Sequence, residues 1–249
     1  MAYRVCWLSA GVSSFVAAYL ARSVDEIIYI DIEDQHPDSM RFVNDCEKVL
    51  RRKITVLKSP YGNVDAACRA FGYISGVRGA KCTEVLKRRT RKEWEYAHRD
   101  CSLVYVWGFD CTEQARADRL DLSMPHAKHE FPLIDHAMTK VDAHGFMRRM
   151  GIKRPVMYDL GYSNNNCIGC VKGGKGYWNK IRVDFPDVFA KRAKLERDIG
   201  ASCINGCYLD ELPVDAGRMQ DEIMNDCGII CEIEFMQAGI NVPALSWEE

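Results

Sequence analysis

Residues 9–14 are the first group in this sequence that could do chemistry. They read Ser-Ala-Gly-Val-Ser-Ser and stand between a β-rich apolar run at 3–8 and a helical stretch at 15–21. Small residues between a strand and a helix let backbone N–H groups approach a phosphate closely, and the helix N-terminus adds positive potential. The loop therefore predicts a phosphate-binding site. The alternative interpretation is a tight strand–helix turn with serine caps.

Twelve cysteines form the second group. In a reducing compartment, cysteines more often serve as core residues, metal ligands or redox groups than as disulfides. Five of them stand alone among apolar or helical neighbours and are expected to be small buried residues: Cys6, Cys46, Cys68, Cys101 and Cys111. The others include three close pairs, which need a separate interpretation.

The pair Cys167 and Cys170 has the two-residue spacing with which one loop supplies two thiolates to zinc or to an iron–sulfur cluster. A four-ligand centre needs two more ligands, and the best candidates are Cys227 and Cys231. Cys82 could substitute for them, as could the pair Cys203 and Cys207, which could equally be a redox pair or loop residues. The sequence therefore predicts a metal centre at Cys167, Cys170, Cys227 and Cys231.

Several cations could contact an anionic ligand. Lys87, Arg116 and Arg119 lie on helical stretches close to predicted strand ends, where an open α/β sheet binds its ligand. Lys172 and Lys175 lie in a glycine-rich loop that suits an anionic group, although they could be ordinary loop lysines. Solvated surface charge is the alternative for all of them and the expectation for Arg88, Arg89 and Lys92. Glu113 is expected to fix Arg116 or to cap its helix.

The elements that would position these residues alternate between strand and helix. Strands are predicted at 3–8, 26–32, 54–57 and 103–108, and helices at 15–21, 39–51, 85–98 and 112–120, the last with a Thr112 cap. Such alternation predicts an open, mostly parallel α/β sheet with helices on both faces. Beyond residue 125 the strand signal fades, and helices are predicted at 140–150 and 177–198.

We therefore expect an α/β nucleotide-binding domain at 1–135 and a helical, cysteine-bearing C-terminal region at 136–249, packed on the same core. The formal net charge of −1 offers no global attraction to nucleic acid or to a membrane, so a nucleic-acid acceptor has no support from net charge. We find no membrane-length apolar run and no secretory leader, so a cytoplasmic protein is expected, with no membrane partner. We also expect a homo-oligomer.

Five segments together resemble the phosphoadenylyl-sulfate (PAPS) reductase family of the PP-loop superfamily. The PP-loop usually reads Ser-Gly-Gly-x-Asp-Ser, and Ser9, Gly11 and Ser14 match it, whereas Ala10 and Ser13 replace a glycine and the acidic residue. The strand end at Asp31, residues 81–87 with a Cys-Thr-x-x-x-Lys pattern, and residues 108–116 follow in the family's order. Residues 160–175 are similar to a stretch in PAPS reductase-like proteins of bacteria and their phages.

The resemblance implies a Rossmann-like PP-loop fold, known as the HUP fold, that binds an adenine nucleotide. It implies nucleotide contacts from two sets of residues. The first set is Ser9, Ala10, Gly11, Ser13 and Ser14; the second is Asp31, Gly108, Glu113, Lys172 and Lys175. It also implies catalytic roles for Lys87, Arg116 and Cys227, because the segment around Cys227 is similar to the one with the family's nucleophilic cysteine.

Three functions remain open. The first is adenylating sulfur transfer, in which ATP with Mg²⁺ gives AMP and pyrophosphate and a sulfur donor or a four-iron cluster on the four cysteines supplies sulfur. The second is a sulfonucleotide reductase, in which Cys227 attacks bound phosphoadenylyl sulfate and a thioredoxin-like reductant completes the reaction. The third is a non-catalytic nucleotide-binding module with structural zinc. The paired cysteines favour the first, and the missing loop aspartate favours the second.

Overall fold

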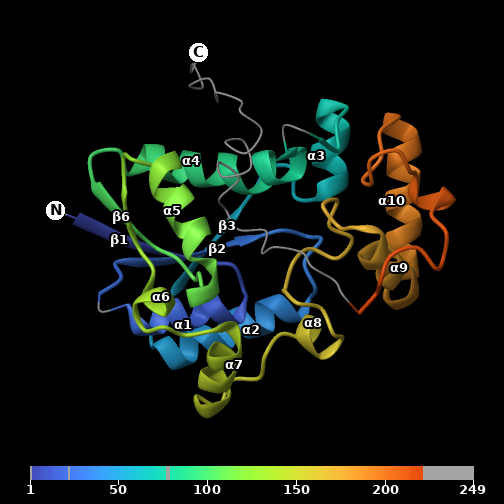
Figure 1. Ribbon diagram of the computed structural model, residues 1–249. Coiled ribbons are helices and arrows are strands. Elements are labelled where there is room, and N and C mark those ends of the chain that lie inside the picture. Colours follow the sequence, from blue (N-terminus) through green and yellow to red (C-terminus); the bar gives the residue numbers. More distant parts are fainter. Residues whose placement is uncertain (1, 22, 77–78, 221–249) are drawn as a thin grey trace.

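The computed structural model describes residues 2–21, 23–76 and 79–220, and its centre is a five-stranded parallel sheet (Figure 1). The strand order is β3-β2-β1-β6-β7. The strands are β1 (Ala2–Leu8), β2 (Glu26–Asp31), β3 (Ile54–Lys58), β6 (Ser102–Val106) and β7 (Lys128–Glu130). All four pairings in this sheet are parallel. The predicted parallel α/β sheet is therefore confirmed.

Helices cover both faces of the sheet (Figure 1). One face carries α1 (Val12–Leu20), α2 (Asp38–Leu50), α6 (Pro132–Asp135) and α7 (Lys140–Arg149). The other carries α3 (Val64–Phe71), the π-helix η1 (Thr83–Arg88), α4 (Arg89–Ala97) and α5 (Gln114–Ser123). Side chains of β1 alternate between the two cores, Val5 and Trp7 on the α4 side and Cys6 and Leu8 on the α1 side. A strand buried on both faces is typical of such sheets.

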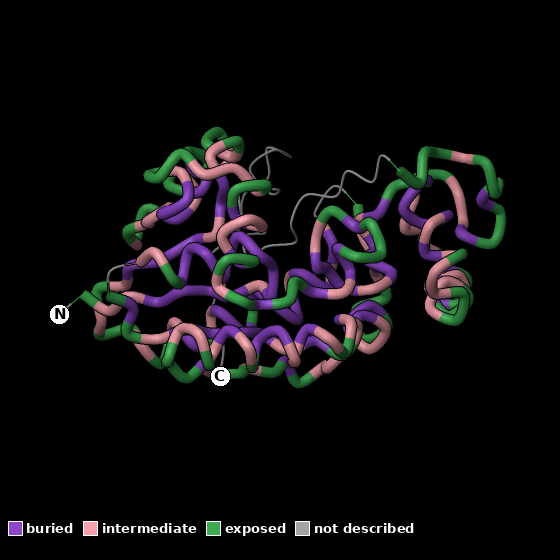
Figure 2. Tube along the Cα trace, turned by 90° about the horizontal axis from the view of Figure 1, so that it is seen from below, coloured by how far each residue is buried: buried purple, intermediate pink, exposed green. Residues whose placement is uncertain are grey.

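A third core lies beside the sheet. It joins α8 (Val156–Asp159), α9 (Lys175–Asp184) and the 3₁₀ turn η3 (Leu209–Glu211), with Trp178 fully buried among them. Helix α10 (Pro186–Ile199) packs against α9, and both helices stand to one side of the sheet (Figures 1 and 2). Within the described residues, no helix is long and apolar enough to cross a membrane.

Two buried charges tie α10 to its neighbours. The guanidinium of Arg192 contacts the carboxylates of Asp34 at 3.0 Å and Asp65 at 2.9 Å, so it joins α10 to the loop after β2 and to α3. Glu196 accepts backbone N–H hydrogen bonds from Cys203 at 2.5 Å and Leu209 at 2.6 Å. Burial raises the pKa of Glu196, and these two hydrogen bonds oppose that shift. These contacts hold the segment after α10 against the helix.

Several predicted elements need correction. The single helix expected at 177–198 is two helices, because the residue before a proline avoids the α region and Phe185 has φ −140° and ψ 64° before Pro186. The strand signal does not end at residue 125, since β7 adds a fifth strand. The helix expected from Thr112 is capped by Asp110, begins as the 3₁₀ turn η2 (Cys111–Glu113) and continues as α5. The basic helix expected at 85–98 starts as the π-helix η1.

Candidate nucleotide-binding site

The sheet order creates a switch point beside β1. From β1 the chain runs outward to β2 and β3 on one side, then crosses back to β6 and β7 on the other. The connection after β1 leads into α1 on one face, and the connection after β6 leads toward α5 on the opposite face (Figure 1). Loops that diverge at such a point leave a crevice at the carboxyl ends of the strands, where open α/β sheets bind ligands.

Residues 9–14 stand at this switch point. Helix α1 begins at Val12 rather than residue 15, so Ser13 and Ser14 belong to its first turn. Ala10 has φ +56°, the left-handed conformation that a glycine usually supplies. Ser14 Oγ accepts the N–H of Ser9 at 3.1 Å and donates to the Gly11 carbonyl at 2.9 Å, so this hydroxyl closes the loop on itself. Gly11 at the N-cap has no side chain to cap α1.

The loop after β6 packs directly on this helix start. A Cβ added to Gly108 would lie 2.5 Å from Ser14 Cα and 2.6 Å from Ser14 N, distances that real Cβ atoms do not show. Glycine is therefore required where the end of β6 approaches the first turn of α1. The close approach of two backbones explains the glycine at residue 108, whereas its contact with a nucleotide stays a prediction.

Glu113 and Arg116 are held in a fixed arrangement after this glycine. Glu113 accepts the N–H of Asp110 at 3.1 Å in a capping box and contacts the Arg116 guanidinium at 2.6 Å. The Arg116 guanidinium lies 4.4 Å from the centre of the Phe109 ring. Both structural roles expected of Glu113, fixing Arg116 and capping its helix, are confirmed. Arg119, in contrast, is exposed.

The segment around residues 163–170 lies across the ends of β1 and β2. Asn165 donates to the Ala10 carbonyl at 2.9 Å and to Ser39 Oγ at 3.0 Å. The N–H of Ile168 donates to the Asp34 carbonyl at 2.8 Å. The segment flagged in the sequence is therefore in contact with the proposed phosphate loop, although 155 residues separate Ala10 from Asn165.

Tyr158 and Asn165 are site residues that the sequence interpretation missed. The Tyr158 hydroxyl accepts the N–H of Val12 at 3.3 Å, in the first turn of α1. The side-chain oxygen of Asn165 is buried and has no hydrogen-bond partner among the described residues. The sequence carried one signal for Asn165, the run Asn164-Asn165-Asn166, because a run of amide side chains is unusual in a buried segment. The sequence around Tyr158 carries no comparable signal.

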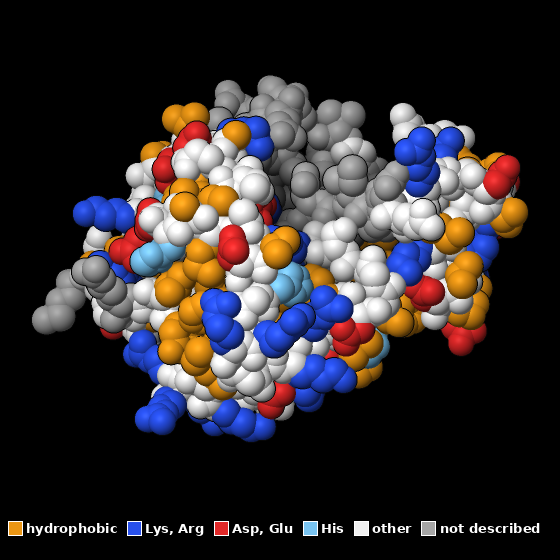
Figure 3. All heavy atoms as spheres, turned by 60° about the horizontal axis from the view of Figure 1, so that its bottom comes forward, with side chains coloured by type: hydrophobic (Ala, Val, Ile, Leu, Met, Phe, Trp, Pro, Cys, Tyr) orange, Lys and Arg blue, Asp and Glu red, His pale blue; other side chains and the backbone are white. Residues whose placement is uncertain are grey.

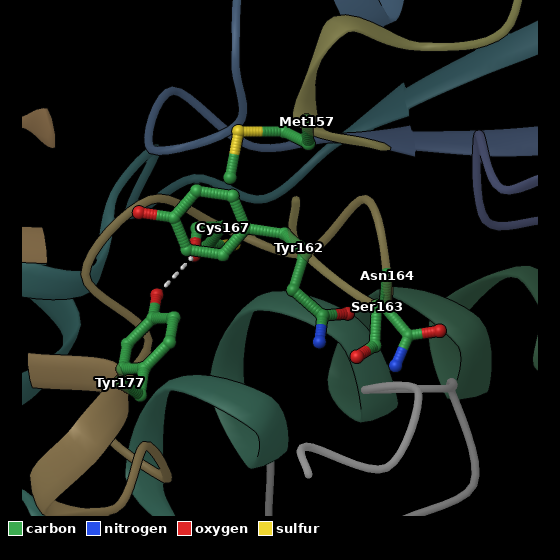
Figure 4. Close-up of a pocket in the computed structure, with 7 residues that line it drawn as sticks. Met157, Tyr162, Ser163, Asn164, Cys167 and Tyr177 are labelled. Carbon is green, nitrogen blue, oxygen red and sulfur yellow. Dashed lines mark hydrogen bonds between the residues drawn. The ribbon is translucent and has the colours of Figure 1, made fainter. Parts of the chain in front are cut away.

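A small pocket of about 10 Å³, room for about one water molecule, lies within the same segment (Figure 4). Its polar lining comes from Ser163, Asn164 and Asn166, and its rings come from Tyr162 and Tyr177. The remaining lining residues are Met157 and Cys167. Figure 4 shows the Tyr177 hydroxyl directed at the Cys167 carbonyl, a hydrogen bond of 3.2 Å. The pocket therefore combines aromatic faces with amide and hydroxyl groups.

The predicted cations have diverse surroundings. Lys87 lies on η1 and is 8% exposed, and Arg88 is 6% exposed, so the expectation of a surface position for Arg88 is wrong. Lys172 is half-buried, and Lys175 is exposed at the start of α9. Asp31, at the end of β2, pairs with Lys58 at 3.2 Å. The turn of π-helix explains the burial of Lys87 and Arg88, because an extra residue per turn changes which side chains face the core.

Only half of the predicted metal centre lies in the described part of the chain. Cys167 and Cys170 are buried, but Cys167 packs in the core on the α4 side and Cys170 in the core beside the sheet. Cys227 and Cys231 lie outside the described residues. Among the residues described, no group of three or more His, Cys, Asp and Glu side chains could hold a metal ion, so Cys82, Cys203 and Cys207 do not complete the centre there.

The isolated cysteines behave largely as expected. Cys6, Cys46 and Cys68 are buried, and burial raises the pKa of Cys6 to about 12 and that of Cys68 to about 11. Cys101 and Cys111 are only half-buried. A thiol with a raised pKa is a poor nucleophile, so these buried cysteines are packing residues.

Comparison with known proteins adds no family to these observations. No protein-family model matches the sequence, and no curated protein matches it. What the chain can bind or catalyse therefore rests on its own residues and on the motif resemblance described above.

Proposed function

We propose that this protein is a PP-loop nucleotide-binding enzyme that adenylates an acceptor, releasing pyrophosphate from ATP and supporting sulfur transfer. The observation that carries the proposal is the loop at the switch point. There the N-terminus of α1 begins at an N-cap glycine, Ala10 adopts the left-handed turn, and the segment with Asn165 lies over it. Backbone N–H groups and the helix dipole at such a start favour a phosphate.

The side chains around the loop suit the charges of the substrate. Phosphate groups beside α1 would be approached by cations at the strand ends, for which Arg116 and Lys87 are the candidates. An acceptor oxygen would attack the α-phosphorus, the bond to the bridging oxygen would break, and pyrophosphate would leave with that oxygen's electron pair. Charge stabilisation of the leaving group is the main task of the protein in such a step.

The expected cofactors place different demands on this site. Mg²⁺ is commonly held by substrate phosphates and water with few protein ligands. Such a metal needs few carboxylates from the protein, and two nearby carboxylates already have partners. Asp31 pairs with Lys58, and Asp110 accepts the N–H of Thr112 in the helix cap. For the four-iron cluster, the described residues supply two of the four proposed thiols, those of Cys167 and Cys170. The proposed adenylation requires no cluster.

A sulfonucleotide reductase is the second candidate. Its support is Ser13, which stands in the first turn of α1 where the resembled loop has an acidic residue. A neutral hydroxyl there suits nucleotide binding without ATP cleavage. In this reaction the Cys227 thiolate would attack the sulfur of phosphoadenylyl sulfate, and adenosine bisphosphate would leave. A thiol reductant would then release sulfite from the cysteine.

Calorimetric titration with Mg-ATP, and in parallel with phosphoadenylyl sulfate, tests the proposal. The informative variant is Gly11→Asp, because an aspartate is a good N-cap and keeps the helix, yet it places a negative charge where the phosphates are expected. We expect Gly11→Asp to weaken Mg-ATP binding at least about tenfold relative to Gly11→Ala. Residue 11 is buried, so the melting temperature of both variants is measured beside the affinity. Gly11→Ala is the matched control, since its Cβ would meet only the ends of Ser9 and Tyr158 side chains.

The outcomes separate the candidates. Binding of Mg-ATP that depends on Gly11, followed by release of AMP and pyrophosphate with an acceptor, supports adenylation. Preference for phosphoadenylyl sulfate selects the reductase. If the wild-type protein binds neither nucleotide, or if Gly11→Asp binds both as well as the wild type does, the phosphate site is not at residues 9–14.

A further inference from the structure

One buried asparagine joins three parts of the chain at the candidate site. Asn165 is 5% exposed and belongs to the segment 163–170, which contains no helix or strand. Its side-chain nitrogen donates to the carbonyl of Ala10, in the loop after β1, and to the hydroxyl of Ser39, in the first turn of α2. Because a carbonyl can only accept, the nitrogen rather than the oxygen of this amide must face Ala10. The orientation of the Asn165 amide is therefore fixed.

The oxygen of the same amide distinguishes Asn165 from a structural asparagine. Asn179 on α9 is 3% exposed, and its nitrogen donates to the carbonyls of Pro213 at 2.9 Å and Ala216 at 2.8 Å. Its oxygen accepts from Arg182 at 2.8 Å. The buried oxygen of Asn165, in contrast, has no such donor in the part of the chain that the structure describes. A buried acceptor without a donor lowers stability, so packing alone does not explain an asparagine at residue 165.

The bond from Asn165 also fixes the peptide group between Ala10 and Gly11. A trans peptide is planar, and its C=O and N–H point in opposite directions. Asn165 holds the carbonyl end, so the N–H of Gly11 points away from Asn165. That N–H makes no hydrogen bond to another of the described residues. One hydrogen bond to the carbonyl of Ala10 therefore decides the direction of a donor that is left for a ligand.

The surroundings of this peptide group favour an anion. Helix α1 begins directly after it, at Val12, and the N-terminus of a helix adds positive potential. Figure 3, which brings the face over α1, α2 and α7 forward, shows more Lys and Arg than Asp and Glu on it. The exposed cations on this side of the sheet include Arg148, Arg149 and Lys153. An oriented N–H at such a helix start suits a phosphate oxygen.

We propose that Asn165 is a positioning residue of the phosphate site, which aims the N–H of Gly11 at a phosphate group of the bound nucleotide by holding the carbonyl of Ala10. The inference rests on the proposed function, in which phosphates bind beside α1. Asn165 acts through the peptide group between residues 10 and 11 and does not itself touch the phosphate. The donor is oriented before the ligand arrives, so binding requires little rearrangement of the loop.

The amide resonance of Gly11 tests this inference directly. Glycine-selective isotope labelling gives one resonance for each glycine, and Gly11→Ala identifies the one from Gly11. In Asn165→Asp we expect this resonance to move with pH, because a protonated carboxyl can donate to the carbonyl of Ala10 and a carboxylate cannot. Burial should raise the pKa of the new carboxyl above its ordinary value of about 3.9. The wild-type resonance should not follow this titration.

Calorimetric titration with Mg-ATP measures the consequence for binding. Relative to the wild type at the same pH, Asn165→Asp should bind at least about tenfold more weakly once its carboxyl has lost the proton, and should regain affinity when it is protonated. Asn165→Ser is the neutral second variant, since its shorter side chain does not reach the carbonyl of Ala10. We expect a displaced Gly11 resonance and weak binding from Asn165→Ser at every pH.

Asn179→Ser is the matched control, because it removes two hydrogen bonds of the same kind from a buried asparagine elsewhere. It should lower the melting temperature and leave both the Gly11 resonance and the affinity for Mg-ATP unchanged. The inference is wrong if Asn165→Ser keeps the wild-type Gly11 resonance, or if the affinity of Asn165→Asp does not change with pH relative to the wild type. It is also wrong if Asn179→Ser weakens binding as much as Asn165→Ser, since binding would then follow stability.

Failure of the proposed function has a different signature. A wild-type protein that does not bind Mg-ATP overturns the proposed function in the first titration, before any variant at residue 165 is compared. The Gly11 resonance is recorded without nucleotide, so a resonance that ignores Asn165 overturns this inference even when the wild type binds Mg-ATP tightly.

Discussion

Ala10 illustrates how one backbone angle shapes the candidate site. A left-handed conformation costs an L-residue about 1–2 kcal/mol, and the resembled loop has glycine at this position. In this chain the Ala10 methyl is fully buried in the core on the α1 side, which contributes about 0.8 kcal/mol and offsets part of that cost. Alanine therefore keeps the turn that a phosphate loop needs, and its presence is compatible with phosphate binding.

Gly108 gives the first prediction at the scale of a residue. In Gly108→Ala the new methyl would meet the backbone of Ser13 and Ser14, which cannot move without displacing the first turn of α1. We expect a loss of about 1–3 kcal/mol in the free energy of unfolding. We also expect a nucleotide affinity at least about tenfold weaker, because a displacement of 1 Å at a binding site has effects of this size. Urea unfolding and calorimetry measure the two quantities.

The control for this substitution is Gly174→Ala. Gly174 is the exposed N-cap of α9, and no atom lies within 4 Å of a Cβ added there. We expect it to change neither stability nor nucleotide binding. Equal behaviour of the two variants would show that the loop after β6 can move away from α1 without consequence, and that the close approach has no role in binding.

Residues of the site differed in how well the sequence could predict them. Residues 9–14 and Glu113 were predictable because their roles are set by neighbours in the chain: a strand and helix around the loop, and a helix start beside Glu113. Tyr158 and Asn165 were not, because their partners Val12 and Ala10 are about 150 residues away. A single sequence shows which types of side chain are present but does not show such distant pairs.

At the scale of elements, α10 depends on one buried arginine. Arg192→Met would keep the volume of the side chain but leave the carboxylates of Asp34 and Asp65 close together, Asp34 without its cation and Asp65 with only the 3.7 Å contact to Arg69. We expect the free energy of unfolding to fall by about 3–5 kcal/mol, since removing one partner of a buried ion pair leaves uncompensated charge. Because Asp34 follows β2 and contacts the segment at residue 168, we also expect weaker nucleotide binding.

Lys194→Met provides the comparison on the same helix. Lys194 pairs with Asp198 at 2.9 Å, but its side chain is exposed, and surface pairs contribute about 0–1 kcal/mol. Urea unfolding of the two variants gives the contrast directly. A loss for Arg192→Met no larger than that for Lys194→Met would mean that α10 is held by apolar packing alone.

Elements were predictable where a pattern is local and not where burial decides. Alternating apolar runs gave β1, β2, β3 and β6 within one or two residues. The three-residue β7 carries Lys128, His129 and Glu130, a sequence with no apolar signal, and it pairs because the sheet edge at β6 is available. The charged stretch at 177–198 read as one helix, but Pro186 divides it into two. Its charges also gave no sign that Arg192 and Glu196 are the most buried among them.

At the scale of the whole molecule, charge is distributed unevenly. The net charge of −1 predicts little affinity for polyanions, but residues 140–154 carry five Lys and Arg against one Asp, while many carboxylates pair with cations elsewhere. Net charge could be predicted from the sequence, whereas its arrangement required the fold. Two histidines, His129 on β7 and His144 on α7, also connect the charge of the molecule to its stability.

Both histidines should make the protein less stable as the pH falls below neutral. Burial lowers the pKa of each from the usual 6.5. His129 Nδ1 accepts the indole N–H of Trp107 at 2.9 Å while Nε2 faces the Met124 carbonyl at 3.1 Å, so a second proton would set two N–H groups against each other. The unfolded chain then binds more protons than the native state, and stability declines as the pH drops through 6.5.

Because both rings are half-buried, solvent screening limits the loss between about pH 7.5 and pH 6 to about 1 kcal/mol for the pair. The raised pKa of Glu196 acts in the opposite sense, since its native state takes up a proton more readily than the unfolded chain, and that effect is complete only below 4.5, the ordinary pKa of a glutamate. Urea unfolding of His129→Gln/His144→Gln, whose amides can replace both hydrogen bonds of His129, should show a flatter profile over this range. A variant that loses stability on acidification as steeply as the wild type would place the titrating groups elsewhere in the chain.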